Sequence, residues 1–417
     1  MNKGLQRTAL AMIIASALTI SAAQVAGASV STDNASGSTA HRAAVKQHPI
    51  LLPTAANQWA QSTNGPSPLQ PPAPPCPENG QLPSPFSNCG LPGFPAVGQP
   101  YLGNMAYWGG HVQVHPHVYL ILWGWGQPGA FSGPCRTERF QERTIHVTLK
   151  CDPQGVGKRM ADFVSEMGGT QWAGVQTQYY QDVKTATGTK RQFIVNDKNV
   201  LAGVWTDNTN RITKKVTYTN MAEEAQRAAA HFHVAKKDLI NANFVIAQPA
   251  LFSDPQAAKQ GYCAFHDYTQ KEIEGGIYKH VTAGLAYTNM PYVASQGTGC
   301  GANLVNAGAA GALDGVTIAL GHEIEETVTD PGAEDVLSDG TILGGWFDPF
   351  DPEENGDKCA YVGDNFGLTD PSNTGEPGSA GNMNGNRGDK FPVQSLWSNT
   401  AAGGAGYCAG AGTDLPF

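Results

Sequence analysis

The chain has 417 residues, with 35 Asp and Glu against 26 Lys and Arg and a formal net charge of −9. Charged residues make up 15% of it and include no basic run, so we expect no nucleic-acid partner. The 50 Gly and 28 Pro residues are typical of a loop-rich globule. The length allows one large domain or two modest ones.

Residues 1–28 have the pattern of a secretory signal peptide. Lys3 and Arg7 form a basic start, an apolar stretch covers residues 9–20, and the A-G-A at 26–28 matches a cleavage site. That stretch is shorter than the ~20 residues that cross a bilayer, and no later segment is long enough. The sequence therefore predicts an exported protein, extracellular or held in the periplasm or cell wall, with no membrane span. A retained N-terminal anchor is the alternative, and the oligomeric state stays unknown.

Eight cysteines follow the signal. An even number in an exported chain predicts disulfides rather than catalytic thiols, and no C-x-x-C is present to form a cysteine zinc site. Pairing neighbours along the chain predicts Cys76–Cys89, Cys135–Cys151, Cys263–Cys300 and Cys359–Cys408.

Residues 29–100 differ in composition from the rest of the chain. Ser, Ala and Asn dominate first, and the proline-rich run 66–75 follows. Such a segment favours polyproline II and cannot bury enough apolar surface to pack alone. We expect a leader or linker, with a propeptide that keeps a hydrolase inactive as the alternative.

The folded part is predicted to be residues 101–417. Apolar runs predict strands at 118–123, 191–195, 200–205, 243–247 and 285–287, and helix-forming segments lie at 156–167, 174–183 and 221–231. Their alternation predicts an α/β or α+β domain with a central mixed sheet. From residue 344 onward the chain is loop-rich.

The most informative segment is a predicted helix that Asp314 caps and Pro331 ends. His322 and Glu326 lie four residues apart, so their side chains leave one face of that helix. This is the spacing with which zinc hydrolases place two ligands, and Glu323 stands where a general base activates a metal-bound water. The motif is H-E-x-x-E, with glutamate in place of the second histidine of H-E-x-x-H.

A short motif of this kind also occurs on solvated helix faces. The low charge of the preceding run indicates burial instead, and a dense acidic stretch follows between Asp330 and Asp357. Carboxylates gathered around one helix repel one another unless a cation or protons compensate them. Zinc accepts carboxylate oxygens, so we predict zinc here, and a structural calcium in residues 348–357 is an alternative.

A catalytic zinc needs a third protein ligand. Glu354 and Asp357 are the first candidates, because they lie beside a cysteine predicted to be in a disulfide. His266 is an alternative third ligand, or a catalytic donor that stabilises a developing oxyanion. Asp330 is interpreted as a cap or turn residue before Pro331.

The C-terminal two-thirds of the chain, about residues 109–408, resembles the Exordium, or phosphate-induced, family of extracellular proteins and its bacterial relatives. The resemblance is carried by separated motifs in order: GHEIEETVTDP at 321–331, CAFH at 263–266, WFD at 346–348, ENGDKC at 354–359, NMNGNR at 382–387 and FPVQSLWS at 391–398. Glu325 departs from the alanine usual in the family, and acidic residues are inserted before Trp346.

The resemblance implies secretion to the cell wall or medium and a zincin-like H-E-x-x-E helix. Together with the predicted disulfides, it leads us to expect a single zincin-like domain with a disulfide-held C-terminal part. No catalytic activity is firmly attached to the family, although its bacterial branch resembles metallopeptidases. Two hypotheses follow. The first is a zinc-dependent metallopeptidase acting on protein or peptide substrates. The second is a non-catalytic extracellular or wall-associated binding protein that holds a structural metal.

Overall fold

A computed structural model describes most of the chain beyond residue 103, and every structural statement below concerns the described residues. They are 104–132, 136–149, 151–214, 216–254, 257, 262–269, 284–332, 343–348, 354–360, 380–404 and 406–410. The predicted signal peptide, the leader and the predicted Cys76–Cys89 pair lie outside them.

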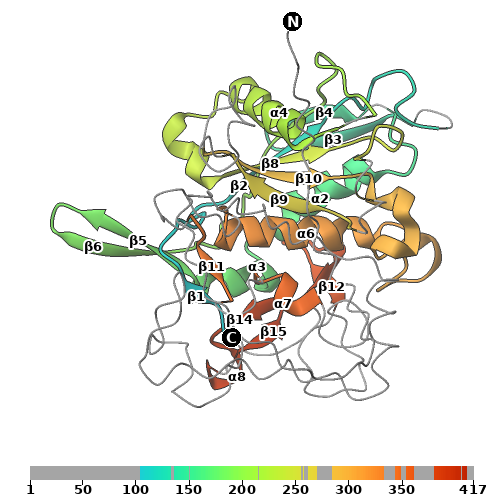
Figure 1. The fold of residues 1–417 in the computed structure, drawn as a ribbon. Helices are drawn as coiled ribbons and strands as arrows, with labels where there is room; N and C mark the ends of the chain where they lie inside the picture. Colours follow the sequence, from blue (N-terminus) through green and yellow to red (C-terminus); the bar gives the residue numbers. More distant parts are fainter. Residues whose placement is uncertain are drawn as a thin grey trace, which may run out of the picture.

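A five-stranded mixed sheet forms the centre of the molecule, as predicted (Figure 1). Its order is β7 (Leu201–Trp205), β2 (His117–Leu122), β8 (Ala242–Ala247), β10 (Ala286–Met290) and β9 (Phe265–Tyr268). The first four strands are parallel, and β9 runs antiparallel to β10 at one edge. The domain is thus α/β in its core.

Side chains alternate between the two faces of this sheet, because successive residues of a strand point in opposite directions. Ile121 and Phe244 join a core cluster with the helix α4 (Tyr218–His231). Leu120 and Val245 join a second cluster with α2 (Val156–Met167) and α6 (Asp314–Thr329). Figure 1 shows α4 above the sheet and α6 below it.

All 16 residues of α6 are buried. The helix lies between the sheet and the C-terminal part, where Thr317 donates to the backbone oxygen of Pro392 (2.6 Å). The prediction that Asp314 caps the helix was wrong in detail: Leu313 is the N-cap, and Asp314 accepts instead from the backbone N–H groups of Val305 and Asn306. The helix stops at Asp330, directly before Pro331, as predicted.

The C-terminal part consists of short pieces, of which β13 (Lys390–Gln394) packs against α6. They are β11 (Trp346–Phe347), which pairs with β1 (Ala106–Tyr107), then α7 (Asp357–Ala360), the hairpin β12 (Ala380–Asn384) with β13, β14 (Leu396–Ser398), α8 (Ala401–Gly404) and β15 (Tyr407–Ala409). Two predicted disulfides are confirmed, Cys263–Cys300 and Cys359–Cys408. Cys151 is also disulfide-bonded, and its predicted partner Cys135 lies outside the described residues.

Two further hairpins complete the fold: β3 (Glu138–Glu142) with β4 (Ile145–Leu149), and β5 (Tyr180–Thr185) with β6 (Gly188–Phe193). The remaining turns of helix are α3 (Gln171–Gly174) and the 3-10 segments Val175–Gln178, Lys236–Asn241, Val293–Cys300 and Gly308–Ala310.

The predicted helix at 174–183 was wrong. In that range Gly174 is the last residue of α3 (Gln171–Gly174), Val175–Gln178 forms a 3-10 turn, and β5 begins at Tyr180. Arg191 of the partner strand pairs with Asp182 (3.0 Å) and stacks over the Tyr180 ring (3.5 Å). These cross-strand contacts, which join residues about ten positions apart, outweigh local helix propensity.

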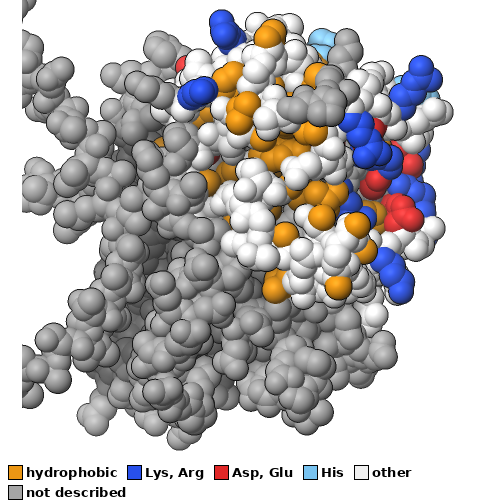
Figure 2. Space-filling model, turned by 90° about the vertical axis from the view of Figure 1, so that its right-hand side faces the viewer, with side chains coloured by type: hydrophobic (Ala, Val, Ile, Leu, Met, Phe, Trp, Pro, Cys, Tyr) orange, Lys and Arg blue, Asp and Glu red, His pale blue; other side chains and the backbone are white. Residues whose placement is uncertain are grey.

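The face drawn in Figure 2 has Lys and Arg side chains next to Asp and Glu, without one continuous basic patch among the described residues. Of the helices in the described ranges, none is long and apolar enough to cross a bilayer.

Candidate metal centre

The structure brings together all six side chains that the sequence singles out. Helix α6 supplies His322, Glu323 and Glu326, the edge strand β9 supplies His266, and the turn into α7 supplies Glu354 and Asp357. All six are buried, and the three on α6 have no exposed surface. Because His322 and Glu326 are one helical turn apart, both face the same space below the sheet.

Three ligand atoms converge around His322. Its Nε2 lies 2.9 Å from Oε1 of Glu326 and 3.4 Å from Oδ1 of Asp357. The three residues form one of two groups whose nitrogen and carboxylate atoms all lie within 4.8 Å of one another. Ligands of a tetrahedral zinc at 2.0–2.1 Å are separated by about 3.3 Å, so these spacings suit a shared ion.

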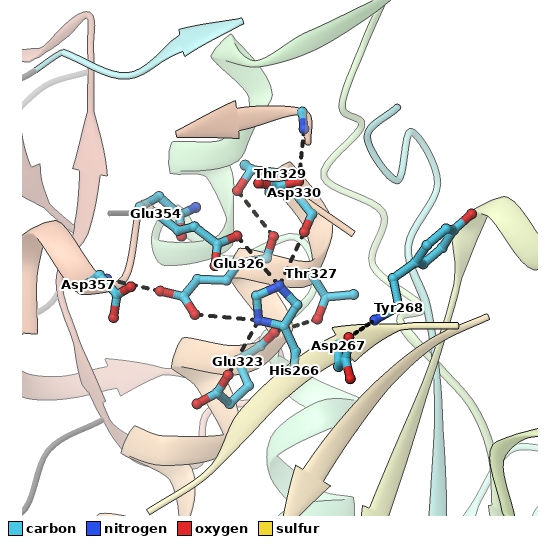
Figure 3. Close-up of polar contacts among 12 residues, drawn as sticks. His266, Asp267, Tyr268, Glu323, Glu326, Thr327, Thr329, Asp330, Glu354 and Asp357 are labelled. Carbon is cyan, nitrogen blue, oxygen red and sulfur yellow. Dashed lines mark hydrogen bonds and ion pairs between the residues drawn. The ribbon is translucent and has the colours of Figure 1, made fainter. Parts of the chain in front are cut away.

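The second group surrounds His266 (Figure 3). Its Nδ1 lies 3.5 Å from Oε2 of Glu323 and 3.6 Å from Oε2 of Glu326, and its Nε2 lies 3.5 Å from Oε1 of Glu354. Glu326 therefore takes part in both groups, with one carboxylate oxygen in each.

Several of these buried atoms have no hydrogen-bond partner among the described residues. They are both ring nitrogens of His322, both carboxylate oxygens of Glu323, Oε2 of Glu326 and Oε1 of Glu354. An unsatisfied buried polar atom costs about 1–3 kcal/mol, and more when it is charged. The Nε2 of His322 is close to Glu326 but not aligned with it for a hydrogen bond. Buried ligand atoms that lie close together without hydrogen-bonding to one another have the arrangement of atoms that share a cation.

The cluster is strongly acidic. The ion pairs of Glu323, Glu326 and Glu354 within the described ranges are with His266 and His322. The buried Lys358 lies close in sequence, but it pairs with Asp348 (2.5 Å) instead. Imidazole nitrogen combined with carboxylate oxygen suits zinc better than calcium, which takes oxygen ligands. The donor set therefore fits the predicted metal.

Without a metal, protons compensate the negative charge. Burial raises the pKa of Glu323 to about 7, although His266 and His322 act in the opposite direction. Burial alone lowers the pKa of His322, but Glu326 and Asp357 outweigh it and raise the pKa well above 6.5. The pKa of His266 is raised in the same way by Glu354, Glu323 and Glu326 against the effect of burial. The pKa of Glu354 is raised mainly by burial.

The turn into α7 fixes the orientation of Glu326. The backbone N–H of Asp357 donates to Oε1 of Glu326 (2.9 Å), and Gln394 donates to the backbone oxygen of Gly356 (2.7 Å). A Cβ added at Gly356 would lie 2.7 Å from Oε1 of Glu326 and 2.8 Å from Nδ1 of His322. The missing side chain therefore leaves room for the cluster.

Two contributions were missed by the sequence reasoning. One is Gly356, whose position between Glu354 and Asp357 was the available signal. The other is the backbone oxygen of Asp330, which accepts from Nε2 of His266 (3.1 Å) and holds the ring. Asp330 is the C-cap of α6, and its side chain accepts from the N–H of Gly345, 15 residues further on (2.8 Å).

Comparison with known proteins shows a partial similarity. The chain is 27% identical to Protein EXORDIUM-like 5 of Arabidopsis thaliana over 150 residues, which are 33% of this chain and 39% of the relative. The match thus spans about two fifths of the length of that relative. No protein-family model matches the chain, and no solved structure matches it. The similarity supports an Exordium-like family.

Proposed function

We propose that this chain is an exported zinc-dependent hydrolase of the metallopeptidase type, acting on protein or peptide substrates. The observation that carries the proposal is the convergence of His322, Glu326 and Asp357 on one buried point, with Glu323 beside them. Neither oxygen of Glu323 is engaged by a hydrogen bond within the described residues. The confirmed disulfides and the Exordium-like similarity support export.

In this proposal His322, Glu326 and Asp357 hold the metal. Zinc supplies a Lewis acid that polarises a carbonyl and lowers the pKa of a coordinated water to about 7. Glu354 lies on the far side of His266, 3.5 Å from its Nε2. It therefore supports the histidine rather than joining the first group, and Asp357 is the better third ligand of the two candidates.

Glu323 is the general base of the proposal. Its carboxylate accepts a proton from the attacking water and returns it to the leaving amine. His266 lies 3.5 Å from Oε2 of Glu323, and its protonated form would donate a hydrogen bond to the oxyanion that develops on the substrate. The H-E-x-x-E helix below a mixed sheet supports a zincin-like assignment of the fold.

The test is Glu323→Gln, assayed on unstructured protein substrates with purified mature chain. We expect hydrolysis to fall by about 10²–10⁴-fold, because the base is lost, while at least one zinc ion stays bound. Glu325→Gln is the matched control, since Glu325 is two residues away on the same buried helix and joins neither ligand group. Equal hydrolysis by wild-type protein and Glu323→Gln would refute the mechanism.

A second candidate function is a non-catalytic binding protein with a structural metal. The burial of Glu323 favours this second function. A substrate of the hydrolase must reach Glu323, and this side chain has no exposed surface. In that case removal of zinc by a chelator would lower the melting temperature by several degrees, and no substrate would be cleaved. Loss of hydrolysis with an unchanged melting temperature would instead support the hydrolase.

A further inference from the structure

The carboxylate of Glu326 has one oxygen in each of two ligand groups. We propose that the centre has a second cation position, formed by Nδ1 of His266 with Oε2 of Glu323 and Oε2 of Glu326, so that Glu326 bridges two ions. This inference rests on the proposed function, because the first ion is the zinc held by His322, Glu326 and Asp357.

The orientation of His266 carries the first step. Its Nε2 lies 3.1 Å from the backbone oxygen of Asp330, and a carbonyl oxygen only accepts, so Nε2 bears a hydrogen. In the neutral ring with its hydrogen on Nε2, the lone pair of Nδ1 faces Glu323 and Glu326. A histidine that binds a metal almost always donates its other N–H to a carbonyl or carboxylate in this way.

The second step is the state of the facing carboxylates. Oε2 of Glu323 and Oε2 of Glu326 are fully buried, lie 3.5 and 3.6 Å from Nδ1, and have no hydrogen-bond donor within the described residues. These separations are close to the about 3.3 Å between ligands of one tetrahedral zinc. Three atoms with lone pairs thus face one common point. Only a proton or a cation bound there relieves the repulsion between them.

The third step is charge. Glu323, Glu326, Glu354 and Asp357 carry four formal negative charges when ionised, and one divalent cation compensates half of them. A second divalent cation compensates the two charges that remain. Two-metal hydrolytic sites place their ions about 3.5–4 Å apart, a separation that one bridging carboxylate spans.

The second position has a functional consequence. An ion there engages Glu323, the proposed base, and Nδ1 of His266, the proposed oxyanion donor. The second ion therefore inhibits the hydrolysis that the first supports. Because it joins a site that already holds a cation, it binds more weakly than the first.

The test is equilibrium dialysis of the full mature chain, purified without a His-tag, against graded Zn²⁺, with bound metal measured by elemental mass spectrometry. We expect two zinc ions per chain for the wild type and for Glu325→Gln. We expect one ion for His266→Ala, with the tighter affinity retained. Glu323→Gln should lose the same weak site, which keeps the test valid if His266→Ala does not fold.

The outcomes separate the two proposals. One zinc in the wild type, retained in His266→Ala and lost in His322→Ala, would overturn the second position and leave the proposed function standing. Two ions in the wild type, His266→Ala and Glu323→Gln alike would place the weak ion elsewhere and overturn the inference. A third outcome is that the wild type binds two ions, His266→Ala and Glu323→Gln each bind one, and no protein hydrolyses the substrate. This outcome would support the second position and overturn the hydrolase.

Discussion

The backbone N–H of Asp357 donates to Oε1 of Glu326 over 2.9 Å, and the same oxygen lies 2.9 Å from Nε2 of His322. One carboxylate oxygen therefore joins the H-E-x-x-E helix to a turn 31 residues downstream. When the surrounding protein donates a hydrogen bond to a metal-binding side chain, that bond fixes the side chain's rotamer and sets its basicity. The C-terminal part is thus a structural support of the centre.

Gly356→Ala should weaken zinc binding. The added methyl group would lie 2.7 Å from Oε1 of Glu326 and 2.8 Å from Nδ1 of His322, so either the ligands or the turn must move. The φ angle at Gly356 lies outside the left-handed region, so alanine causes no backbone strain there. The expected effect comes from steric overlap alone. We expect a loss of ~10–100-fold in zinc affinity, the range for disturbed ligand support, measured with a competing chelator.

Gly174→Ala is the control for this variant. Gly174 ends α3 with helical backbone angles, and an added Cβ would meet only the amide nitrogen of Asn196 at 3.3 Å. Its zinc affinity should equal that of the wild type. Equal affinities for all three proteins would mean that Gly356 does not shape the centre.

The Cys359–Cys408 disulfide should stabilise the fold substantially. It closes a loop of 49 residues and connects α7, two residues after Asp357, to β15. The chain-entropy relation gives about 4 kcal/mol for a loop of this length. We expect Cys359→Ala/Cys408→Ala to lose free energy of unfolding of that order and to bind zinc more weakly, measured by denaturant titration with and without zinc. A variant as stable as the wild type would show that packing alone holds this part.

Much of the centre was predictable from local sequence. The spacing of His322, Glu323 and Glu326 defines one face of a helix, and Pro331 marks its end, because both depend on residues within a few turns. Cys359 beside Asp357 indicated a segment held by a disulfide. These inferences need only the helical repeat and the chemistry of short motifs.

The rest depends on tertiary structure. His266 lies 57 residues before Glu323 in sequence, and it reaches the cluster because β9 is added antiparallel at the edge of a sheet whose other strands are parallel. No local pattern specifies that register. The same limit explains β5, where pairing with Arg191 and its neighbours overrides a segment that reads as helix. Glu326 places one carboxylate oxygen in the ligand group of His322 and the other in that of His266. The tertiary structure alone shows this.

Acid should destabilise the protein through His111. Burial lowers the pKa of this histidine to about 4, and although the residue is partly exposed, its Nε2 is buried without a hydrogen-bond partner within the described ranges. The unfolded chain takes up a proton near pH 6.5 and the folded chain only near pH 4. The stabilisation is therefore fully present above pH 6.5 and is lost as the pH falls through 4, by up to about 3 kcal/mol.

His111→Phe tests this pH dependence. Phenylalanine keeps an aromatic ring near Tyr268, whose ring centroid lies 5.4 Å from that of His111, but it cannot take up a proton. We expect the free energy of unfolding of the wild type to fall more steeply than that of the variant between pH 6.5 and 4. Parallel curves would show that His111 is accessible to protons in the folded state.

Hydrolysis should respond to zinc in two phases. The first equivalent should restore the activity of chelator-treated protein, because His322, Glu326 and Asp357 then hold the metal. Excess zinc should reduce activity, since the second ion engages Glu323 and His266. The measurement is the initial rate against free Zn²⁺ in a metal buffer. Ca²⁺ at the same concentrations should not inhibit, because imidazole nitrogen is a poor calcium ligand. A rate that rises to a plateau and stays there would mean that no inhibitory ion reaches Glu323.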